Sequence, residues 1–153
     1  MDEDIFRRPG YLINRLARLS NRWADTRFQK LGLAIAQMPV LYTLKDGTSS
    51  TQSELARLAY IEQPTMAQLL ARMERDGLIR RTANPDDRRS SLVSLTPRAL
   101  KKLPEAGGIL LDGHKKVLQG FTKQEIETLS HLLQRVLDNL EPMVAQDEAD
   151  RTQ

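Results

Sequence analysis

Between residues 61 and 78 the chain alternates apolar and polar positions with the period of an α-helix. The apolar positions that recur on one side of such a helix are Met66, Leu69, Leu70 and Met73. The other side carries Gln63, Thr65, Gln68 and Arg72. Pro64 suits the first turn of a helix, and Gly77 suits the left-handed residue that ends one. We therefore predict a helix with one face in the core and one face free to contact a partner.

A shorter helix is predicted just before this one. Thr51 and Glu54 have the spacing of a capping box, in which the Thr51 hydroxyl accepts from the Glu54 N–H and the Glu54 carboxylate accepts from the Thr51 N–H. The apolar residues of this helix are Leu55, Ala56, Leu58 and Ala59. Because only residues 60–63 join the two helices, they must pack at a steep angle, which is a helix-turn-helix pattern.

Two short strands are predicted after Gly77, at residues 78–83 and 91–95. The loop between them, residues 84–89, is polar, charged and rich in turn-forming residues. A charged hairpin directly after a helix-turn-helix is a wing. The fold class expected is therefore mainly α with a small β wing.

This segment resembles the winged helix-turn-helix of the MarR family of bacterial transcriptional regulators, and most closely its SlyA-like branch. The residues that carry the resemblance are Ser53-Glu54-Leu55-Ala56, Ile61-Glu62-Gln63-Pro64-Thr65, then Leu69, Met73, Glu74, Gly77, Leu78, Ile79 and Arg81, and finally Asp87-Arg88-Arg89, Leu92-Val93 and Leu95-Thr96. The resemblance implies a DNA-binding domain at residues 34–96. It also implies a homodimer held together by helices from residues 1–33 and 97–153.

The flanking segments also have helical patterns. Pro9 to about Gln29 forms one expected helix, with an apolar stripe at Leu12, Leu16, Leu19 and Trp23, and residues 35–45 form a second. Thr96-Pro97 begins a long helix, in which we expect Pro104 and Gly107-Gly108 to cause a kink or local irregularity. A capping box at Thr122–Glu125 opens the last helix, whose apolar stripe is Ile126, Leu129, Leu133, Val136, Leu137, Leu140 and Val144. That stripe has no large domain left to cover it, which favours a homodimer interface.

Composition narrows the function. The chain of 153 residues has a formal net charge of +3, with basic residues concentrated around the wing and acidic residues at the C-terminal end, a distribution typical of a surface that faces a polyanion. It has no cysteine, which excludes disulfides, thiolate metal sites and cysteine redox switches. The acidic N-terminus is unlike a signal peptide, and no apolar run approaches the roughly 20 residues that span a bilayer. We expect a cytoplasmic protein without a membrane partner.

No group of residues indicates catalysis, a metal site or a cofactor. His114 and His131 are too far apart in sequence for a helical metal pair, and solvent-facing or helix-packing histidines are the more common case. Gly107-Gly108 is a lone dipeptide rather than a phosphate loop. We therefore predict a protein that is not an enzyme and has neither metal nor cofactor.

The predicted partner is double-stranded DNA. Pro64, Thr65 and Gln68 are expected at the major groove, since glutamine can pair with adenine and the threonine methyl can touch a thymine methyl. The resemblance implies that Arg89 enters the minor groove and that Asp87 orients its guanidinium. The remaining DNA contacts, to phosphate or at the edge of the groove, are expected from Gln52, Ser53, Gln63, Arg72, Arg75 and Arg88.

Family members commonly release DNA when a small aromatic or phenolic acid binds. Here Arg15 and Arg18 could hold a carboxylate, and the apolar wall would come from Trp23, Met38 and Tyr42. Solvated or paired arginines at a dimer surface are an equally good interpretation, and the aromatic residues can be simply core. Repression and activation both stay open.

The alternative from another class of function is a winged helix that serves as a protein-interaction module. Such a module would present hydrophobic anchors on its second helix. The hydrogen-bonding face at Gln63, Thr65 and Gln68 favours base edges and phosphates instead.

Overall fold

The computed structural model describes residues 3–151, which form two compact units that divide between Gly113 and His114. The first unit begins with η1 (Glu3–Arg7), α1 (Pro9–Phe28), η2 (Gln29–Leu31), η3 (Ile35–Gln37) and α2 (Met38–Thr43). It continues with β1 (Ser49–Thr51), α3 (Gln52–Ala59), α4 (Gln63–Arg75), β2 (Ile79–Ala83), β3 (Ser91–Leu95) and α5 (Pro97–Val117), whose last turn crosses the boundary. The second unit consists mainly of α6 (Lys123–Arg151). The predicted fold class is confirmed.

The helix-turn-helix packs around a single apolar core. The predicted stripe of α4 lies inside it, and Met66, Leu70 and Met73 have no exposed surface. Neighbouring elements contribute Phe28 from α1 and Ala99 from α5 to the same core. Because burying one such large apolar side chain stabilises a fold by about 1.5–3 kcal/mol, the orientation of α4 is firmly determined.

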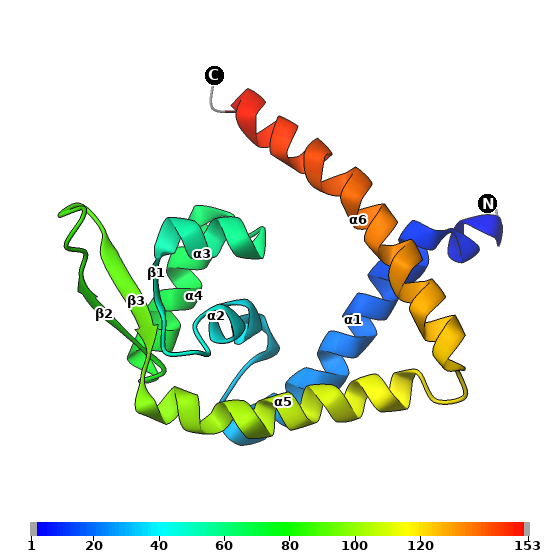
Figure 1. Ribbon diagram of the computed structural model, residues 1–153, viewed down its shortest axis with the longest axis horizontal. Coiled ribbons are helices and arrows are strands. Elements are labelled where there is room, and N and C mark those ends of the chain that lie inside the picture. Colours follow the sequence, from blue (N-terminus) through cyan, green and yellow to red (C-terminus); the bar gives the residue numbers. More distant parts are fainter. Residues whose placement is uncertain (1–2, 152–153) are drawn as a thin grey trace. The chain divides into compact units, whose positions relative to one another are not determined.

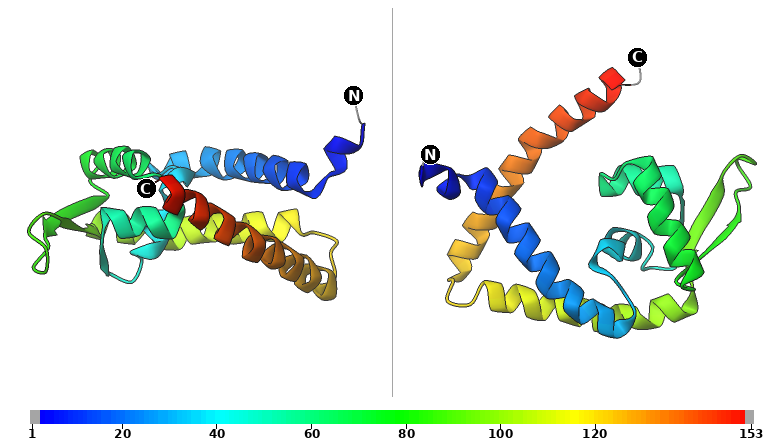
Figure 2. Two further views of the ribbon diagram at one scale, coloured as in Figure 1. Left: turned by 90° about the horizontal axis from the view of Figure 1, so that it is seen from above. Right: turned by 180° about the vertical axis from the view of Figure 1, so that it is seen from behind.

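The wing is part of a three-stranded antiparallel sheet with the order β1-β3-β2. The hairpin aligns Ile79 with Leu95, and both side chains are buried. In Figure 1 the hairpin extends beside α3 and α4, and β3 leads directly into α5; both views in Figure 2 show the same arrangement. The third strand, β1, was not predicted, since three small polar residues carry no alternation of apolar and polar positions.

The end of α4 is fixed by hydrogen bonds to its own backbone and to α5. Gly77 adopts φ +70°, and the N–H of Leu78 donates to the Met73 carbonyl at 2.8 Å. Only glycine adopts this left-handed conformation without strain, so Gly77 ends the helix as predicted. The Thr96 hydroxyl donates to the Gly77 carbonyl at 2.7 Å, and Arg98 donates to the Asp76 carbonyl at 3.1 Å.

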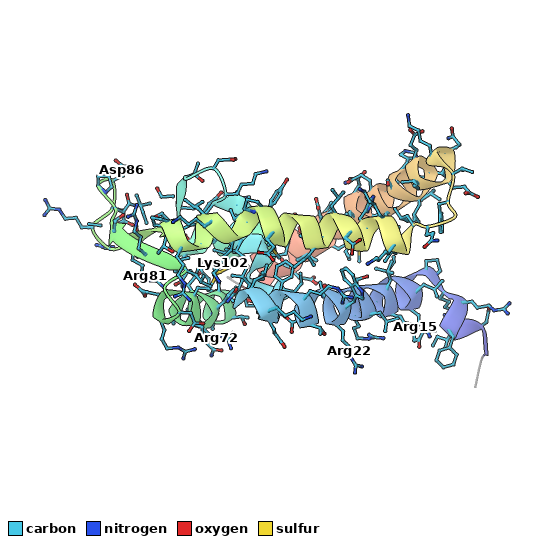
Figure 3. All side chains as sticks on the ribbon, turned by 90° about the horizontal axis from the view of Figure 1, so that it is seen from below. Arg15, Arg22, Arg72, Arg81, Asp86 and Lys102 are labelled. Carbon is cyan, nitrogen blue, oxygen red and sulfur yellow. The ribbon has the colours of Figure 1, made fainter. Side chains whose placement is uncertain are left out.

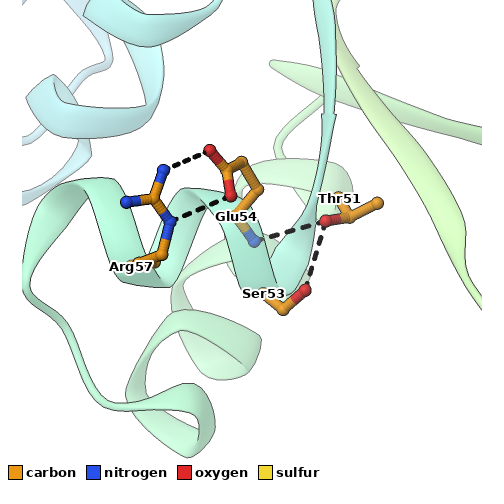
Figure 4. Close-up of polar contacts among 4 residues, drawn as sticks. All are labelled: Thr51, Ser53, Glu54 and Arg57. Carbon is orange, nitrogen blue, oxygen red and sulfur yellow. Dashed lines mark hydrogen bonds and ion pairs between the residues drawn. The ribbon is translucent and has the colours of Figure 1, made fainter.

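The predicted capping box at α3 is only half formed. The Thr51 hydroxyl accepts from the Glu54 N–H at 3.2 Å, as expected. The Glu54 carboxylate accepts from two nitrogens of Arg57 instead, at 2.6 and 3.1 Å, and does not return to Thr51 (Figure 4). A guanidinium one turn along the helix offers two charged donors, which bind a carboxylate more strongly than a single backbone N–H.

A local irregularity was expected in α5 at Pro104 and Gly107-Gly108. That expectation is wrong for the secondary structure, because one helix runs through all three residues. Its apolar side chains contact the core on both sides of the proline, with Ala99 and Ala106 buried. These contacts hold the helix although Pro104 removes one of its backbone hydrogen bonds. The Lys102 ammonium also donates to the Leu31 carbonyl, which ties α5 to the segment after α1 (Figure 3).

The helices α1 and α6 follow their predicted ranges, and each presents large apolar side chains to solvent. In α1 these are Leu12, Leu16 and Leu19, which are 47–56% exposed. In α6 they are Leu129, Leu132, Val136, Leu137, Leu140 and Met143. The capping box at the start of α6 is complete, since Thr122 and Glu125 exchange both of its hydrogen bonds at 2.8 and 3.2 Å. Among the helices of the described residues, none is long and apolar enough to cross a membrane.

We predict that Thr96→Ala lowers the free energy of unfolding by about 1–2 kcal/mol, because its hydroxyl caps α5 and also binds the carbonyl of Gly77. Urea denaturation followed by circular dichroism measures the change. Thr26→Ala is the matched control, since this exposed hydroxyl binds only a carbonyl of its own helix, where alanine is the better helix former. Equal losses in the two variants would contradict the assigned role of Thr96.

Candidate nucleic-acid interface

The exposed face of α4 carries every side chain that the sequence predicted for it. Gln63, Pro64, Thr65 and Gln68 are exposed along its first half, with Arg72 one turn further on. In Figure 3, Arg72 lies on the side of α4 that faces away from α5. Arg75 forms an exposed ion pair with its neighbour Asp76 at 3.4 Å. The face therefore offers amide, hydroxyl and guanidinium groups on a helix whose other side is buried.

The start of α3 adds a second group of polar side chains beside this face. The Thr51 and Ser53 hydroxyls are 3.2 Å apart. Gln52 donates its side-chain N–H to the side-chain carbonyl of Gln63 at 3.3 Å, which joins the first residues of the two helices. The structure thus brings the predicted residues Gln52 and Ser53 to the border of the α4 face.

The ion pair of Glu54 and Arg57 is a feature that sequence reasoning missed. Its hydrogen bonds to Arg57 hold the pKa of the Glu54 carboxyl below its usual value, and they raise the pKa of Arg57. Glu54 is therefore ionised at neutral pH and occupied by an internal partner. The signal in the sequence was that Glu54 and Arg57 are three residues apart in one helix. Arg57 therefore competes with the Thr51 N–H of the capping box for the Glu54 carboxylate.

The wing loop is organised by short-range hydrogen bonds to its backbone. The Asp87 carboxylate accepts from the backbone N–H of Arg89 at 2.9 Å. The described residues have no ion pair between the Asp87 carboxylate and the Arg89 guanidinium, because an aspartate reaches the backbone two residues ahead more easily than the end of a long side chain. The pair that the resemblance implies stays a prediction. The Asn84 amide donates to Ser90 at 2.9 Å across the loop. Arg88 and Arg89 are exposed at its tip.

Two further arginines connect the base of the wing to its surroundings. Arg81 in β2 pairs with Glu74 of α4 at 3.3 Å. Arg80 donates to the Ser94 hydroxyl of the adjacent strand at 3.3 Å. The hairpin and α4 are joined mainly through the buried core, which includes Ile79, Leu95 and Met73, and the Arg81 contact adds a link at the surface. The resemblance and the concentration of basic residues around the wing both pointed to Arg81, but neither gave its partner.

Of the five residues proposed to bind an aromatic acid, Trp23 and Met38 pack against the same core. Arg15 and Arg18 are exposed on α1. Trp23 is half-buried, with the Arg27 guanidinium 3.7 Å from its ring centre, and its ring lies so close to Gly113 that a Cβ there would come within 2.6 Å. Tyr42 is 65% exposed, with the Lys45 ammonium 4.2 Å from its ring centre. Met38 packs against the core.

The described residues contain no group of three or more histidine, aspartate or glutamate side chains that could hold a metal ion. His114 and His131 are both exposed.

Comparison with known proteins identifies the family. A model of the MarR family matches residues 33–91. The uncharacterized HTH-type transcriptional regulator YwoH of Bacillus subtilis (strain 168) is 33% identical over 125 residues, which cover 82% of this chain and 90% of the relative. The chain belongs to the MarR family. It is a winged-helix transcriptional regulator of the MarR type, and relatives of this kind are regulators and not enzymes, which confirms that prediction.

Solved structures of MarR and of another transcriptional regulator have the same fold. A mutant of MarR from E. coli in complex with operator DNA superimposes with a TM-score of 0.80 at 26% identity, covering 90% of this chain and 99% of that one. The transcriptional regulator PA3341 is 36% identical with a TM-score of 0.74, covering 87% of this chain and 98% of its own. The MarR family is thus supported by sequence and by fold, while the SlyA-like branch stays a prediction.

Proposed function

We propose that this MarR-family protein is a homodimer that binds a pseudopalindromic, A·T-rich operator and regulates transcription from it. The observation that carries the proposal is the exposed hydrogen-bonding face of α4, opposite a stripe with no solvent contact at Met66, Leu70 and Met73. Two such helices, one per protomer, would enter successive major grooves about one helical turn apart.

Base contacts are assigned to the first two turns of α4. Thr65 and Gln68 are exposed there, and a glutamine amide can donate to adenine N7 while accepting from its N6 amino group. Pro64 would pack beside them at the groove. Arg72 and Arg75 lie further along the helix and are assigned to phosphates, because a long cationic side chain reaches the backbone of either strand.

The start of α3 is assigned to the phosphate backbone. Ser53 is exposed at the first turn of this helix, where unpaired backbone N–H groups and the positive end of the helix dipole favour an anion. Gln52 adds an amide beside it. Contacts of this kind fix the position of a protein on a duplex without reading its sequence.

The wing is assigned to the minor groove. The Asp87 carboxylate binds the loop backbone, and no salt bridge or side-chain hydrogen bond within residues 3–151 engages the guanidinium groups of Arg88 and Arg89. Both cations therefore stay available for DNA. Arg89 would enter the groove, whose negative potential is strongest where A·T pairs make it narrow, and Arg88 would neutralise a phosphate.

Binding of the purified protein to a pool of genomic fragments tests the proposal. We expect enrichment of one shared palindrome, with affinity that falls steeply as salt rises because counterions are released from the phosphates. Weak binding that is indifferent to sequence would instead favour the alternative of a protein-interaction module.

Arg89→Ala is expected to weaken operator binding by about 1–3 kcal/mol if the wing arginine reads the groove. Fluorescence anisotropy with the enriched operator measures the dissociation constant. Lys30→Ala is the matched control, since it removes one exposed cation from the segment after α1 rather than from the wing. If both variants lost the same affinity, the effect would be general charge and the assignment of Arg89 would fail.

The homodimer is proposed to form through helices of residues 1–33 and 97–153, with residues 34–96 as the DNA-binding domain. What supports this is the row of exposed apolar side chains on α1 and α6, which solvent does not favour. We predict that Leu137→Glu dissociates the protein into monomers in analytical ultracentrifugation. His131→Glu adds the same charge at an exposed position on the side of α6 opposite this row and should leave the dimer intact.

Modulation by a small aromatic or phenolic acid is proposed at Arg15, Arg18, Trp23, Met38 and Tyr42. A ligand that binds best to a dimer whose recognition helices have the wrong separation would weaken DNA binding. By linkage, bound DNA would weaken the binding of that ligand by the same factor. Because Trp23 is the only tryptophan, its fluorescence reports binding directly.

Salicylate is expected to quench that fluorescence and to reduce operator affinity by about 5- to 150-fold. If titration changed neither signal, this ligand class would be excluded.

The SlyA-like branch is supported by Arg98-Ala99-Leu100, which follow the wing. Membership of this branch is compatible with repression and also with activation by displacement of a silencer.

A further inference from the structure

The loop of the wing is closed at its neck by the side chains of Asn84 and Ser90. β2 ends at Ala83, β3 begins at Ser91, and these two residues are partners in the hairpin ladder. Asn84 and Ser90 are the next residues on the loop side of that pair. The Asn84 side-chain amide donates to the Ser90 hydroxyl at 2.9 Å, and both residues are partly buried. This bond therefore extends the hairpin by one step into the loop.

The direction of the hydrogen bonds around Asn84 is fixed, because their outer partners are backbone groups. The N–H of Asp86 can only donate, and it donates to the Asn84 side-chain oxygen at 3.1 Å. The Asn84 side-chain nitrogen is therefore the end that meets Ser90. The carbonyl of Asp87 can only accept, and it accepts from the Ser90 hydroxyl at 3.3 Å. The hydroxyl hydrogen of Ser90 is thus directed to Asp87, which leaves the hydroxyl oxygen to accept from Asn84.

This series of hydrogen bonds ends on the turn that carries the two wing arginines. The N–H of Ser90 donates to the Asp87 carbonyl at 3.1 Å, which closes a β-turn with Arg88 and Arg89 as its central residues. The Asp87 carboxylate accepts from the N–H of Arg89 at 2.9 Å within the same turn, a contact for which aspartate is favoured at the first turn position. The backbone of both arginines is therefore held by Asp87 and Ser90, and Ser90 is held by Asn84.

We propose that Asn84 is a positioning residue for DNA binding, which keeps the turn of residues 87–90 in one conformation so that Arg88 and Arg89 meet the duplex already ordered. This proposal rests on the proposed function, in which these arginines bind DNA. A loop that must become ordered on association weakens binding, and a loop that is ordered beforehand avoids that loss. Asn84 acts through the arginines, because both ends of its own amide are engaged within the loop.

Hydrogen bonds are the main support of this loop. Residues 85–89 are all exposed, so burial of apolar side chains does not order them. The hairpin below the loop is anchored separately, by the buried side chains of Ile79, Val93 and Leu95. Asp86 lies in the same exposed loop, at the far end of the hairpin in Figure 3. Loss of the Asn84 amide should therefore loosen the turn while the sheet and the core stay folded.

Limited proteolysis with trypsin tests the order of the turn without DNA. Trypsin cleaves after arginine, and cleavage after Arg88 and Arg89 tracks how often the loop opens. Asn84→Ala removes both hydrogen bonds of the amide. We expect cleavage there to become about 5- to 10-fold faster, which corresponds to freeing roughly one residue of backbone, with an unchanged unfolding midpoint. Asn14→Ala is the matched control, since its exposed amide also donates to a carbonyl, that of Gly10 in α1, and cleavage in the wing should keep its wild-type rate.

Operator binding, measured by fluorescence anisotropy, tests the consequence for DNA. We expect Asn84→Ala to weaken binding by about 5- to 10-fold, the same factor as for cleavage. A double-mutant cycle assigns the effect. In a protein that carries Arg88→Ala and Arg89→Ala, Asn84→Ala should weaken binding no further, because the groups that it positions are gone. The salt concentration of the whole cycle is set low enough for this background to bind.

The outcomes separate the two proposals. If wild type binds no operator, the proposed function fails and the role of Asn84 fails with it. If wild type binds an operator, the role of Asn84 alone is overturned by any of three results: unchanged cleavage in Asn84→Ala, unchanged affinity, or an equal loss of affinity without the two arginines. Faster cleavage together with weaker binding that requires the arginines supports it.

Discussion

The arrangement of the first unit depends on burial of one side of α4. Met66, Leu70 and Met73 have no solvent contact, and they share their core with residues of α1, α2, α3, the sheet and α5. A rotation of α4 about its axis would expose several of these side chains at once, at a cost of about 1.5–3 kcal/mol each. The buried side chains of α4 therefore determine the direction in which its polar face points, although they themselves cannot contact DNA.

The same helix is held at its end by contacts that reach across the sequence. Gly77 turns the chain, Thr96 binds the Gly77 carbonyl, and Arg98 binds the carbonyl of Asp76. Since Thr96 also accepts from the N–H of Ala99, one hydroxyl joins the end of α4 to the start of α5. A shift of α5 would therefore be transmitted to the recognition helix through polar contacts as well as through the core.

Much of this was predictable from sequence, because helical periodicity, Pro64 and Gly77 act locally and agree with one another. The elements that escaped prediction depend on contacts across space. The strand β1 exists because β3 lies beside it, and α5 continues through Pro104 because its neighbours Ala99 and Ala106 are buried. The positions of the candidate site residues followed from the helix faces, but their partners did not. The Glu54 carboxylate binds the Arg57 guanidinium rather than the Thr51 N–H. The Asp87 carboxylate binds a backbone N–H rather than a guanidinium, and the side chains of Gln52 and Gln63 are hydrogen-bonded across the turn.

The order of the sheet has a consequence for solubility. With β3 in the centre, β2 is an edge strand whose outer backbone groups have no neighbouring strand, and such edges invite pairing with another chain. Arg80 and Arg81 lie on that edge strand. A second copy that extended the sheet there would place its own Arg80 cation on the neighbouring strand, whereas Arg81 is already paired with Glu74. The charge on β2 therefore also guards the wing against aggregation, even where many copies of the protein crowd together.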